Sequence, residues 1–228
     1  MRRLAVALTA LIATAASGSA LRAQNLVTDG SFENPALPSS ASFTTILAGN
    51  SFGAWTVTSG SIDLIRTYWA PSDGFQSVDL NGSAAGTISQ NIATSNGQRY
   101  TLRFNIAGNP DGAFDKTMRV WWGAQDLGTF TFTQAGWTKT NMGWQTITLT
   151  GLLATSGSTT LRFAAVTSGA IGIALDNVTV NIVPEPSTLL LLASGLAGAL
   201  LIVRVRRRQL SSSDALLTQP LREPPHPG

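Results

Sequence analysis

The fold is decided by an eight-residue stretch, RYTLRFNI (residues 99–106), in which polar and apolar side chains alternate without a break. Its apolar members are Tyr100, Leu102, Phe104 and Ile106. Successive side chains of a β-strand point to opposite faces, so a period of two predicts a strand with one buried face. The same alternation returns in VTVNI (residues 178–182), near the end of the central region.

Short segments of this kind fill residues 24–183, and turn dipeptides such as Asp73-Gly74 and Asn81-Gly82 separate them. We expect strands near residues 25–28, 55–59, 62–66, 77–80, 86–92, 99–107, 117–122, 127–133, 144–150, 159–166 and 171–182. Many short antiparallel strands with one buried face predict a single all-β domain, an antiparallel β-sandwich or jelly roll.

Composition removes several classes of chemistry. The 228 residues include no cysteine, which excludes disulfides, thiol catalysis and thiolate metal sites. The single histidine is His226, so a histidine base or a multi-histidine zinc site in the domain is excluded as well. The formal charge of +3 comes from the two ends, because residues 24–183 carry seven Lys or Arg against nine Asp or Glu. A domain with a net charge of −2 is not expected to bind nucleic acid.

The N-terminus has the pattern of a signal peptide for export. Arg2 and Arg3 precede a short apolar run, and small residues follow it up to Ala23. We predict a signal peptide over residues 1–23 and a mature chain that starts at Gln24. A retained membrane anchor is the alternative, but the apolar run is short for a membrane span.

The C-terminal region predicts a transmembrane helix over residues 187–203, which contain no charged residue. An arginine cluster follows at residues 204–208 and should stay cytoplasmic, which would place the domain outside the inner membrane. Residues 209–228 are rich in Ser and Pro and predict a disordered tail.

The order of these C-terminal parts carries a resemblance. Pro184, Glu185 and Pro186, followed by an apolar span and a basic cluster, resemble the PEP-CTERM sorting signal of Gram-negative bacteria, here over residues 184–208. The resemblance implies that an exosortase, a membrane transpeptidase, is a partner and removes the tail. It also implies an inner-membrane precursor that is released to the cell surface or the extracellular matrix.

A second resemblance covers nearly all of residues 25–183. It is carried, in order, by NLVTDGSFENP (25–35), GSIDLI (60–65), SVDLNG (77–82), AGNPDG (107–112) and LDNV (175–178). The series resembles the choice-of-anchor C family of exported bacterial proteins and related plant cell-wall proteins. More distantly, it is similar to carbohydrate-binding modules of the galactose-binding jelly-roll type. The resemblance implies a fold and a location, and no reaction.

In those modules, acidic residues of the opening and closing motifs help to hold a structural calcium ion, which implies such a role for Glu33 and Asp176. Calcium accepts carboxylate and backbone oxygens with loose geometry. The alternative is that both carboxylates accept hydrogen bonds from backbone amides at a turn. Asp29 could be a third ligand, although a residue before Gly30 is more typical of a turn.

Aromatic residues suggest a binding surface, because sugar rings stack on flat aromatic side chains while carboxylates bind their hydroxyls. Trp69 adjoins Tyr68 and precedes Asp73 in a segment with strong turn signals, so we predict an exposed carbohydrate platform there. Trp121 should share a strand face with Arg119 and be a further exposed residue that binds carbohydrate, while Trp122 should join the core. Ordinary packing is the alternative for each tryptophan.

Taken together, the sequence predicts an exported, non-catalytic protein that binds extracellular polysaccharide. One alternative is a structural or adhesive matrix protein that binds other proteins. Another is a glycoside hydrolase with a carboxylate pair, but no pair of acids is marked by its spacing. Phosphate-binding loops and nucleophile-elbow motifs are absent from the sequence, so we do not expect an enzyme.

Overall fold

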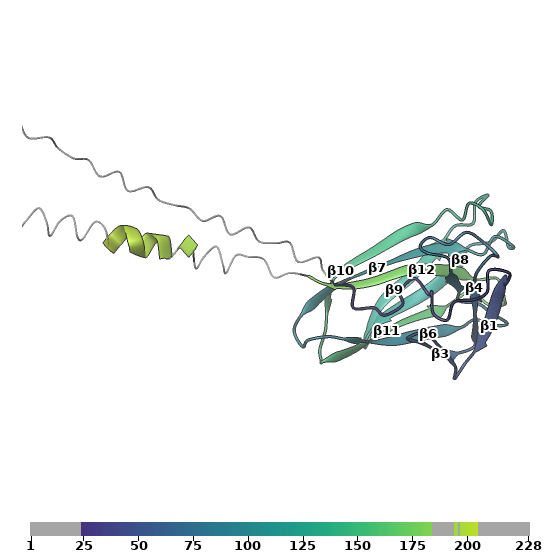
Figure 1. Ribbon diagram of the computed structural model, residues 1–228, viewed down its shortest axis with the longest axis horizontal. Coiled ribbons are helices and arrows are strands. Elements are labelled where there is room, and N and C mark those ends of the chain that lie inside the picture. Colours follow the sequence, from purple (N-terminus) through teal and green to yellow (C-terminus); the bar gives the residue numbers. More distant parts are fainter. Residues whose placement is uncertain (1–23, 184–193, 196, 205–228) are drawn as a thin grey trace, which may run out of the picture. The chain divides into compact units, whose positions relative to one another are not determined.

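A computed structural model describes residues 24–183, 194–195 and 197–204, and it divides the chain into two units at Val183 and Pro184 (Figure 1). The predicted signal peptide, the Pro184, Glu185 and Pro186 motif and the tail over 209–228 lie outside the described residues. The first unit contains the β-domain, and the described part of the second is helical.

Two antiparallel sheets of six strands form the domain. Sheet A has the order β1 (Phe43–Leu47), β4 (Ser61–Ile65), β5 (Ser77–Asp79), β12 (Ile173–Ile182), β7 (Arg99–Gly108) and β10 (Gln145–Leu153). Sheet B has the order β2 (Ser51–Phe52), β3 (Trp55–Ser59), β6 (Thr87–Ala93), β11 (Ser158–Ala165), β8 (Lys116–Trp122) and β9 (Gln125–Phe132). The predicted all-β antiparallel sandwich is confirmed.

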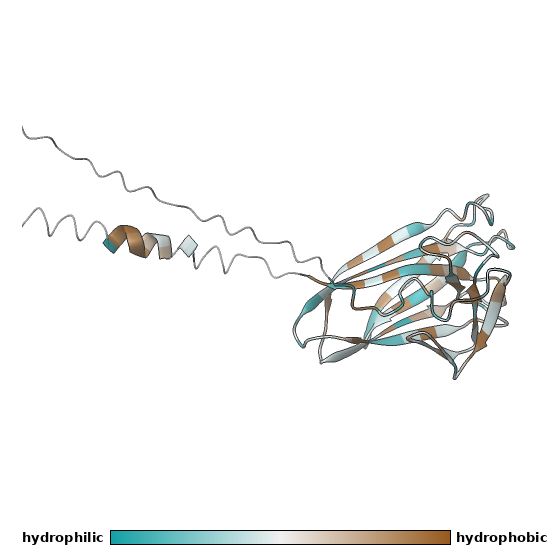
Figure 2. Ribbon diagram, viewed as in Figure 1, coloured by the Kyte–Doolittle hydropathy of each residue, from teal (hydrophilic) through white to brown (hydrophobic). Residues whose placement is uncertain are grey.

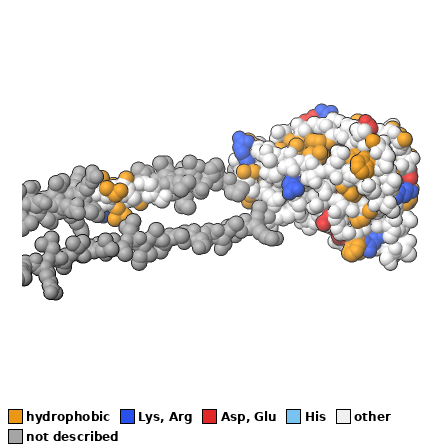
Figure 3. All heavy atoms as spheres, turned by 90° about the horizontal axis from the view of Figure 1, so that it is seen from above, with side chains coloured by type: hydrophobic (Ala, Val, Ile, Leu, Met, Phe, Trp, Pro, Cys, Tyr) orange, Lys and Arg blue, Asp and Glu red, His pale blue; other side chains and the backbone are white. Residues whose placement is uncertain are grey.

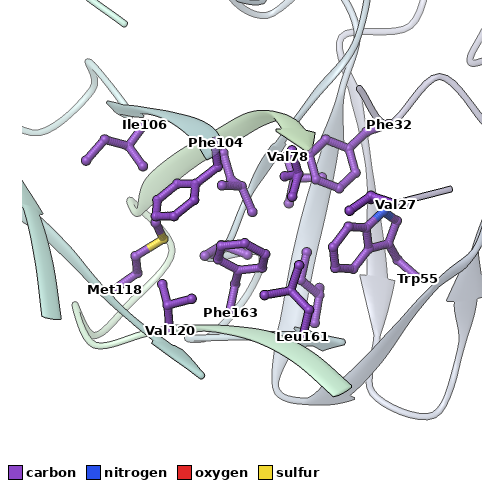
Figure 4. Close-up of a cluster of buried hydrophobic side chains, with 14 of the residues drawn as sticks. Val27, Phe32, Trp55, Val78, Phe104, Ile106, Met118, Val120, Leu161 and Phe163 are labelled. Carbon is purple, nitrogen blue, oxygen red and sulfur yellow. The ribbon is translucent and has the colours of Figure 1, made fainter. Parts of the chain in front are cut away.

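The core lies between the two sheets and consists of the apolar residues that alternate with polar ones along the strands. In Figure 2 this alternation appears as bands of hydrophobic and hydrophilic colour. The RYTLRFNI stretch forms the first eight residues of β7, and its four apolar side chains are buried. Figure 4 shows side chains from both sheets meeting in this layer. The rings of Phe104 in sheet A and Phe163 in sheet B contact edge to face, with centroids 5.2 Å apart. Trp122 is also buried, as predicted.

Two of the strand expectations need correction. Residues 25–28 form no strand, because the side chain of Asn25 takes the place of a ladder: its Oδ1 accepts hydrogen bonds from the backbone amides of Val27 and Val180. Conversely, the edge strands β1 and β2 were not predicted from the sequence. In β1 all side chains but Ile46 are exposed, so it has no buried face to impose alternation, and β2 has only two residues.

In the second unit, residues 194–195 and 197–204 are helical. None of the helices within the described residues has the length and apolar character that a membrane span requires. The predicted span over 187–203 falls partly outside those residues, so it stays a prediction.

Candidate functional site

A loop that lies on the outer face of sheet A organises the candidate site. We call residues 66–76, between β4 and β5, the covering loop. Glu33 holds one end of it: its Oε1 accepts hydrogen bonds from the amides of Phe75, at 2.6 Å, and Gln76, at 2.8 Å. Gly74 makes this approach possible, since a Cβ there would lie 2.3 Å from the same oxygen and the residue has a φ of 61°.

Asp176 on β12 holds the covering loop a few residues earlier. Its Oδ2 accepts hydrogen bonds from the amides of Ser72, at 2.7 Å, and Asp73, at 2.9 Å, and its Oδ1 accepts one from Asn177. The side chain is fully buried. Burial raises the pKa of Asp176 to about 7, although these three N–H donors act in the opposite direction.

Glu33 and Asp176 thus accept hydrogen bonds from backbone amides, which was the alternative to a role in calcium binding. Asp29, the possible third ligand, also behaves as a turn residue, with its carboxylate accepting from the amides of Glu33 and Asn34. Over the part of the chain that the structure describes, His, Cys, Asp and Glu form no group of three or more that could hold a metal ion. Calcium takes six to eight oxygens, so at Glu33 and Asp176 most would come from backbone and water. Calcium there stays a prediction.

Trp69 is not the exposed platform that the turn signals predicted. Its side chain is only 3% exposed, and its Nε1 donates a hydrogen bond to Ser77 Oγ at 2.9 Å. The covering loop turns the indole down onto the outer face of sheet A, where it replaces solvent over the sheet. The expectation was therefore wrong for Trp69, and the alternative of ordinary packing is correct.

Beside the covering loop lies an open groove of about 300 Å³, which we call the sheet A groove. Its lining includes Phe43, Asp63, Tyr68, Asp79, Asn109 and Asp111, with Trp69 at its base. The half-buried Tyr68 ring meets the ring of Phe43 edge to face, at a centroid distance of 5.6 Å. The Tyr68 hydroxyl donates to Asp111 Oδ2, and Lys139 Nζ lies 2.9 Å from Asp111 Oδ1.

Two further carboxylates lie side by side in the groove, because Asp63 on β4 is paired in register with Asp79 on β5. Asp63 is half-buried and accepts a hydrogen bond from Thr45 Oγ1 at 2.6 Å. Burial raises the pKa of Asp63 despite this bond. Burial also raises the pKa of Asp79 to about 7, and repulsion from Asp63 adds to the rise.

Asp79 is enclosed and fixed in place. It is 1% exposed, its Oδ1 accepts from the amide of Asn81, and its Oδ2 accepts from Asn109 Nδ2 at 2.9 Å. The segment after Asn109 is held by the buried Lys116, whose Nζ donates to the carbonyls of Gly112 and Phe114. These contacts fix the wall of the groove that bears Asp111.

The structure does not bring together the four residues predicted to bind carbohydrate. Tyr68 lines the sheet A groove, whereas Asp73 is exposed and lies outside its lining. Trp121 is on the outer face of sheet B, half-buried between Arg162 and Arg119, whose guanidinium carbons are 4.0 Å and 5.6 Å from the ring centroid.

The groove carboxylates Asp63, Asp79 and Asp111 were missed by the sequence reasoning. For Asp63 a signal existed, since it is a polar residue at the outward position of an alternating segment. For Asp79 and Asp111 the motifs SVDLNG and AGNPDG contained the residues but gave no hint that they face one groove.

Residues 25–181 match the family described as "Protein of unknown function (DUF642)". The chain belongs to this family. A second match, to the PEP-CTERM protein-sorting motif, covers residues 183–208 and confirms the resemblance of the C-terminal region. The naming of the DUF642 domain as choice-of-anchor C stays a prediction.

A curated relative of this DUF642 chain is halomucin of Haloquadratum walsbyi (strain DSM 16790 / HBSQ001), 35% identical over 185 residues and 77% of this chain. The chain spans only 2% of halomucin's length.

Solved structures similar to the chain include the CBM22-1 xylan-binding domain of Paenibacillus barcinonensis Xyn10C, with 13% identity and a TM-score of 0.46 over 72% of this chain and 97% of that one. Another is TmCBM61 in complex with β-1,4-galactotriose, with 11% identity and a TM-score of 0.44 over 70% of this chain and 99% of that one.

The burial of Trp69 gives a first prediction for the DUF642 domain. Trp69→Ala should lower the free energy of unfolding by about 3–5 kcal/mol, as truncation of a large buried aromatic side chain does. Tyr68→Ala is the neighbouring control and should cost less, because that side chain is less buried than Trp69. Denaturant unfolding of the purified protein measures both changes, and an equal, small loss for the two variants would contradict the packing role.

The buried carboxyls give a second prediction, on pH. Between about pH 4 and 7 the folded domain retains protons on Asp79 and Asp176 that the unfolded chain, with ordinary carboxyl pKa values of 3.8, has released. Stability should therefore fall as the pH rises through this window, by up to about 1.4 kcal/mol per pH unit for each group.

Melting temperatures of the purified protein from pH 5 to pH 8 measure this slope. Asp79→Asn should be less stable than the parent at pH 5, because an amide nitrogen would face an N–H donor. Its curve should nevertheless be flatter, since one of the two titrating groups is gone. Asp126→Asn is the control, because Asp126 is an exposed acid whose pKa is lowered by its hydrogen bonds with Arg119. A rise in stability toward pH 8 would contradict the raised pKa values of Asp79 and Asp176.

Proposed function

We propose that the protein is exported and binds polysaccharide without catalysis, through the sheet A groove. The observation that carries this proposal is the meeting of aromatic rings and hydrogen-bonding side chains in one open groove. Phe43 and Tyr68 supply the rings, while Asp63 and Asp111 supply carboxylates beside them.

These residue types match the two sides of a sugar. The C–H faces of a pyranose ring pack on aromatic rings, and its hydroxyls donate to carboxylates. The groove of about 300 Å³ is at the lower end of the roughly 300–1,000 Å³ that ligand pockets occupy. An open groove of this size suits a few residues of a longer chain, which can enter and leave at its ends.

The positions of the groove carboxylates argue against catalysis. A glycosidase needs two carboxylates that flank the scissile bond. Asp63 and Asp79 are neighbours in register, but Asp79 is enclosed and its two oxygens are engaged by Asn81 and Asn109. Of the three groove carboxylates, Asp63 and Asp111 are open to a ligand, and Asp111 already forms an ion pair with Lys139.

A structural or adhesive protein that binds other proteins is the second candidate. Two exposed aromatic side chains favour it: Phe75 is 65% exposed and Phe114 is 48% exposed. On the face shown in Figure 3, hydrophobic side chains form separate patches between scattered charges. Protein interfaces of this kind need a contiguous apolar patch, so the groove supports carbohydrate binding better.

The route of the protein is part of the proposal. We infer that residues 1–23 direct export, that the apolar span over 187–203 anchors the precursor in the inner membrane, and that an exosortase cleaves near Pro184, Glu185 and Pro186. The PEP-CTERM match over residues 183–208 supports this sequence of events. Cleavage there would release the β-domain, which ends at Val183, to the cell surface or the extracellular matrix.

The binding proposal predicts the effect of removing a ring. A glycan array probed with the purified protein first identifies a ligand, and Tyr68→Ala should then lower the affinity for it about tenfold, as loss of a stacking contact does. Tyr68→Phe should retain most of the binding, because the ring remains. Phe75→Ala removes an exposed ring outside the groove and should leave the affinity unchanged.

Trp121→Ala distinguishes the two faces of the sandwich. If Trp121→Ala bound more weakly and Tyr68→Ala bound fully, the assignment of the binding site to the sheet A groove would be wrong, and the site would lie on sheet B. If the protein bound no polysaccharide in the array, the proposed function itself would be refuted.

The sorting proposal makes a separate prediction. Replacing Pro184, Glu185 and Pro186 with alanines should leave the precursor uncleaved in the inner membrane, because the exosortase motif is lost. Cell fractionation with an antibody to the β-domain measures this. A control with three alanines at residues 216–218, beyond the arginine cluster, should be processed normally. Equal release of mutant and parent would refute exosortase sorting.

A further inference from the structure

The sheet A groove is unbalanced in charge. Asp63, Asp79 and Asp111 line it, and Lys139 is the cation at its rim. Among the residues that the structure describes, ion pairs engage Asp111 and Asp126, so Asp63 has no cation within ion-pair distance. Asp79 adds less negative charge, because burial raises its pKa to about 7. The buried Lys116 lowers the repulsion around Asp79, but its ammonium group is enclosed and donates to backbone carbonyls.

The rim of the groove already binds a primary ammonium group. Lys139 Nζ lies 3.7 Å from the centroid of the Tyr68 ring and 2.9 Å from Asp111 Oδ1. A ring face and a carboxylate together form the contact set that ammonium groups prefer, since the ring quadrupole and the carboxylate both attract the positive charge. The chain thus supplies its own example of the chemistry that this surface accepts.

Asp63 offers a second position of the same kind without a cation of its own. Its carboxylate is half-buried, accepts one hydrogen bond from Thr45, and lies on the strand next to that of Phe43. The ring of Phe43 is 44% exposed. Both residues line the sheet A groove. A partly desolvated carboxylate attracts a cation more strongly than one in bulk water, because the local dielectric constant is lower.

We propose that the polysaccharide bound in the sheet A groove carries free primary amines, as a de-N-acetylated hexosamine polymer does, and that Asp63 receives the ammonium group. This inference rests on the proposed function and adds a ligand class to it. The same carboxylate disfavours uronates and sulfated glycans, whose anions would approach Asp63 without a compensating cation.

The experiment is a titration of the purified protein with three oligosaccharides of equal length. They are fully de-N-acetylated chitosan oligomers, their N-acetylated counterparts and oligogalacturonate. At low salt and mildly acidic pH, the amine form should bind about fivefold or more tightly than the acetylated form, as one partly desolvated ion pair provides. The advantage should shrink as salt is added, whereas oligogalacturonate should bind most weakly.

Two variants assign the preference to named residues. Asp63→Asn should abolish the advantage of the amine form, so that the amine and acetylated forms bind with equal affinity. Lys139→Gln should increase the affinity for the amine form about fivefold, because it leaves the Tyr68 ring and Asp111 without their internal cation. Asp126→Asn, on sheet B, is the matched acidic control and should change neither affinity. Circular dichroism and melting curves check that all three variants are folded.

The outcomes separate this inference from the function on which it rests. Equal affinity for the amine and acetylated forms, or an amine preference that survives Asp63→Asn, would overturn the inference and leave polysaccharide binding intact. Tightest binding of oligogalacturonate would also overturn it. Failure of all three oligomers, together with a glycan array in which nothing binds, would remove the proposed function.

Discussion

The hold of Glu33 and Asp176 on the covering loop is the interaction on which the rest of the site depends. Glu33 lies near the start of the domain and Asp176 lies on its last strand. The carboxylate of each accepts hydrogen bonds from two backbone amides of the loop. The four bonds hold residues 72–76, the C-terminal half of the covering loop. With this half fixed, the loop closes over sheet A and buries Trp69.

The position of Tyr68 follows from that closure. Because Trp69 faces the sheet, Tyr68 before it faces the neighbouring groove, where it contacts Phe43 and donates to Asp111. One residue of the Tyr-Trp pair is therefore structural and the other is available to a ligand. The pair could not both be exposed without leaving the outer face of sheet A open to water and the Asp176 carboxylate without its amide donors.

Burial of acids is the cost of this arrangement. Asp79 and Asp176 each occupy positions where burial raises the pKa to about 7, so near neutral pH the domain holds carboxyls that would ionise more readily in the unfolded chain. Sites that bind ligands often accept such a loss of stability. The proposed preference for amine-bearing glycans rests instead on Asp63, the groove carboxylate that is open to a ligand and forms no ion pair within the described residues.

The sequence by itself determined the sandwich, the assignment of Phe104 and Trp122 to the core, and the sorting motif at the C-terminus. Each depends on order or spacing over a few residues, which the chain displays directly. Only the tertiary structure decided that Trp69 is buried, that Glu33 and Asp176 bind loop amides, and that Asp63, Asp79 and Asp111 share a groove. The physical reason is that a side chain on the outer face of a sheet has the same local pattern whether solvent or a loop covers it. Contacts between segments far apart in the chain decide between the two, and local periodicity contains no record of them.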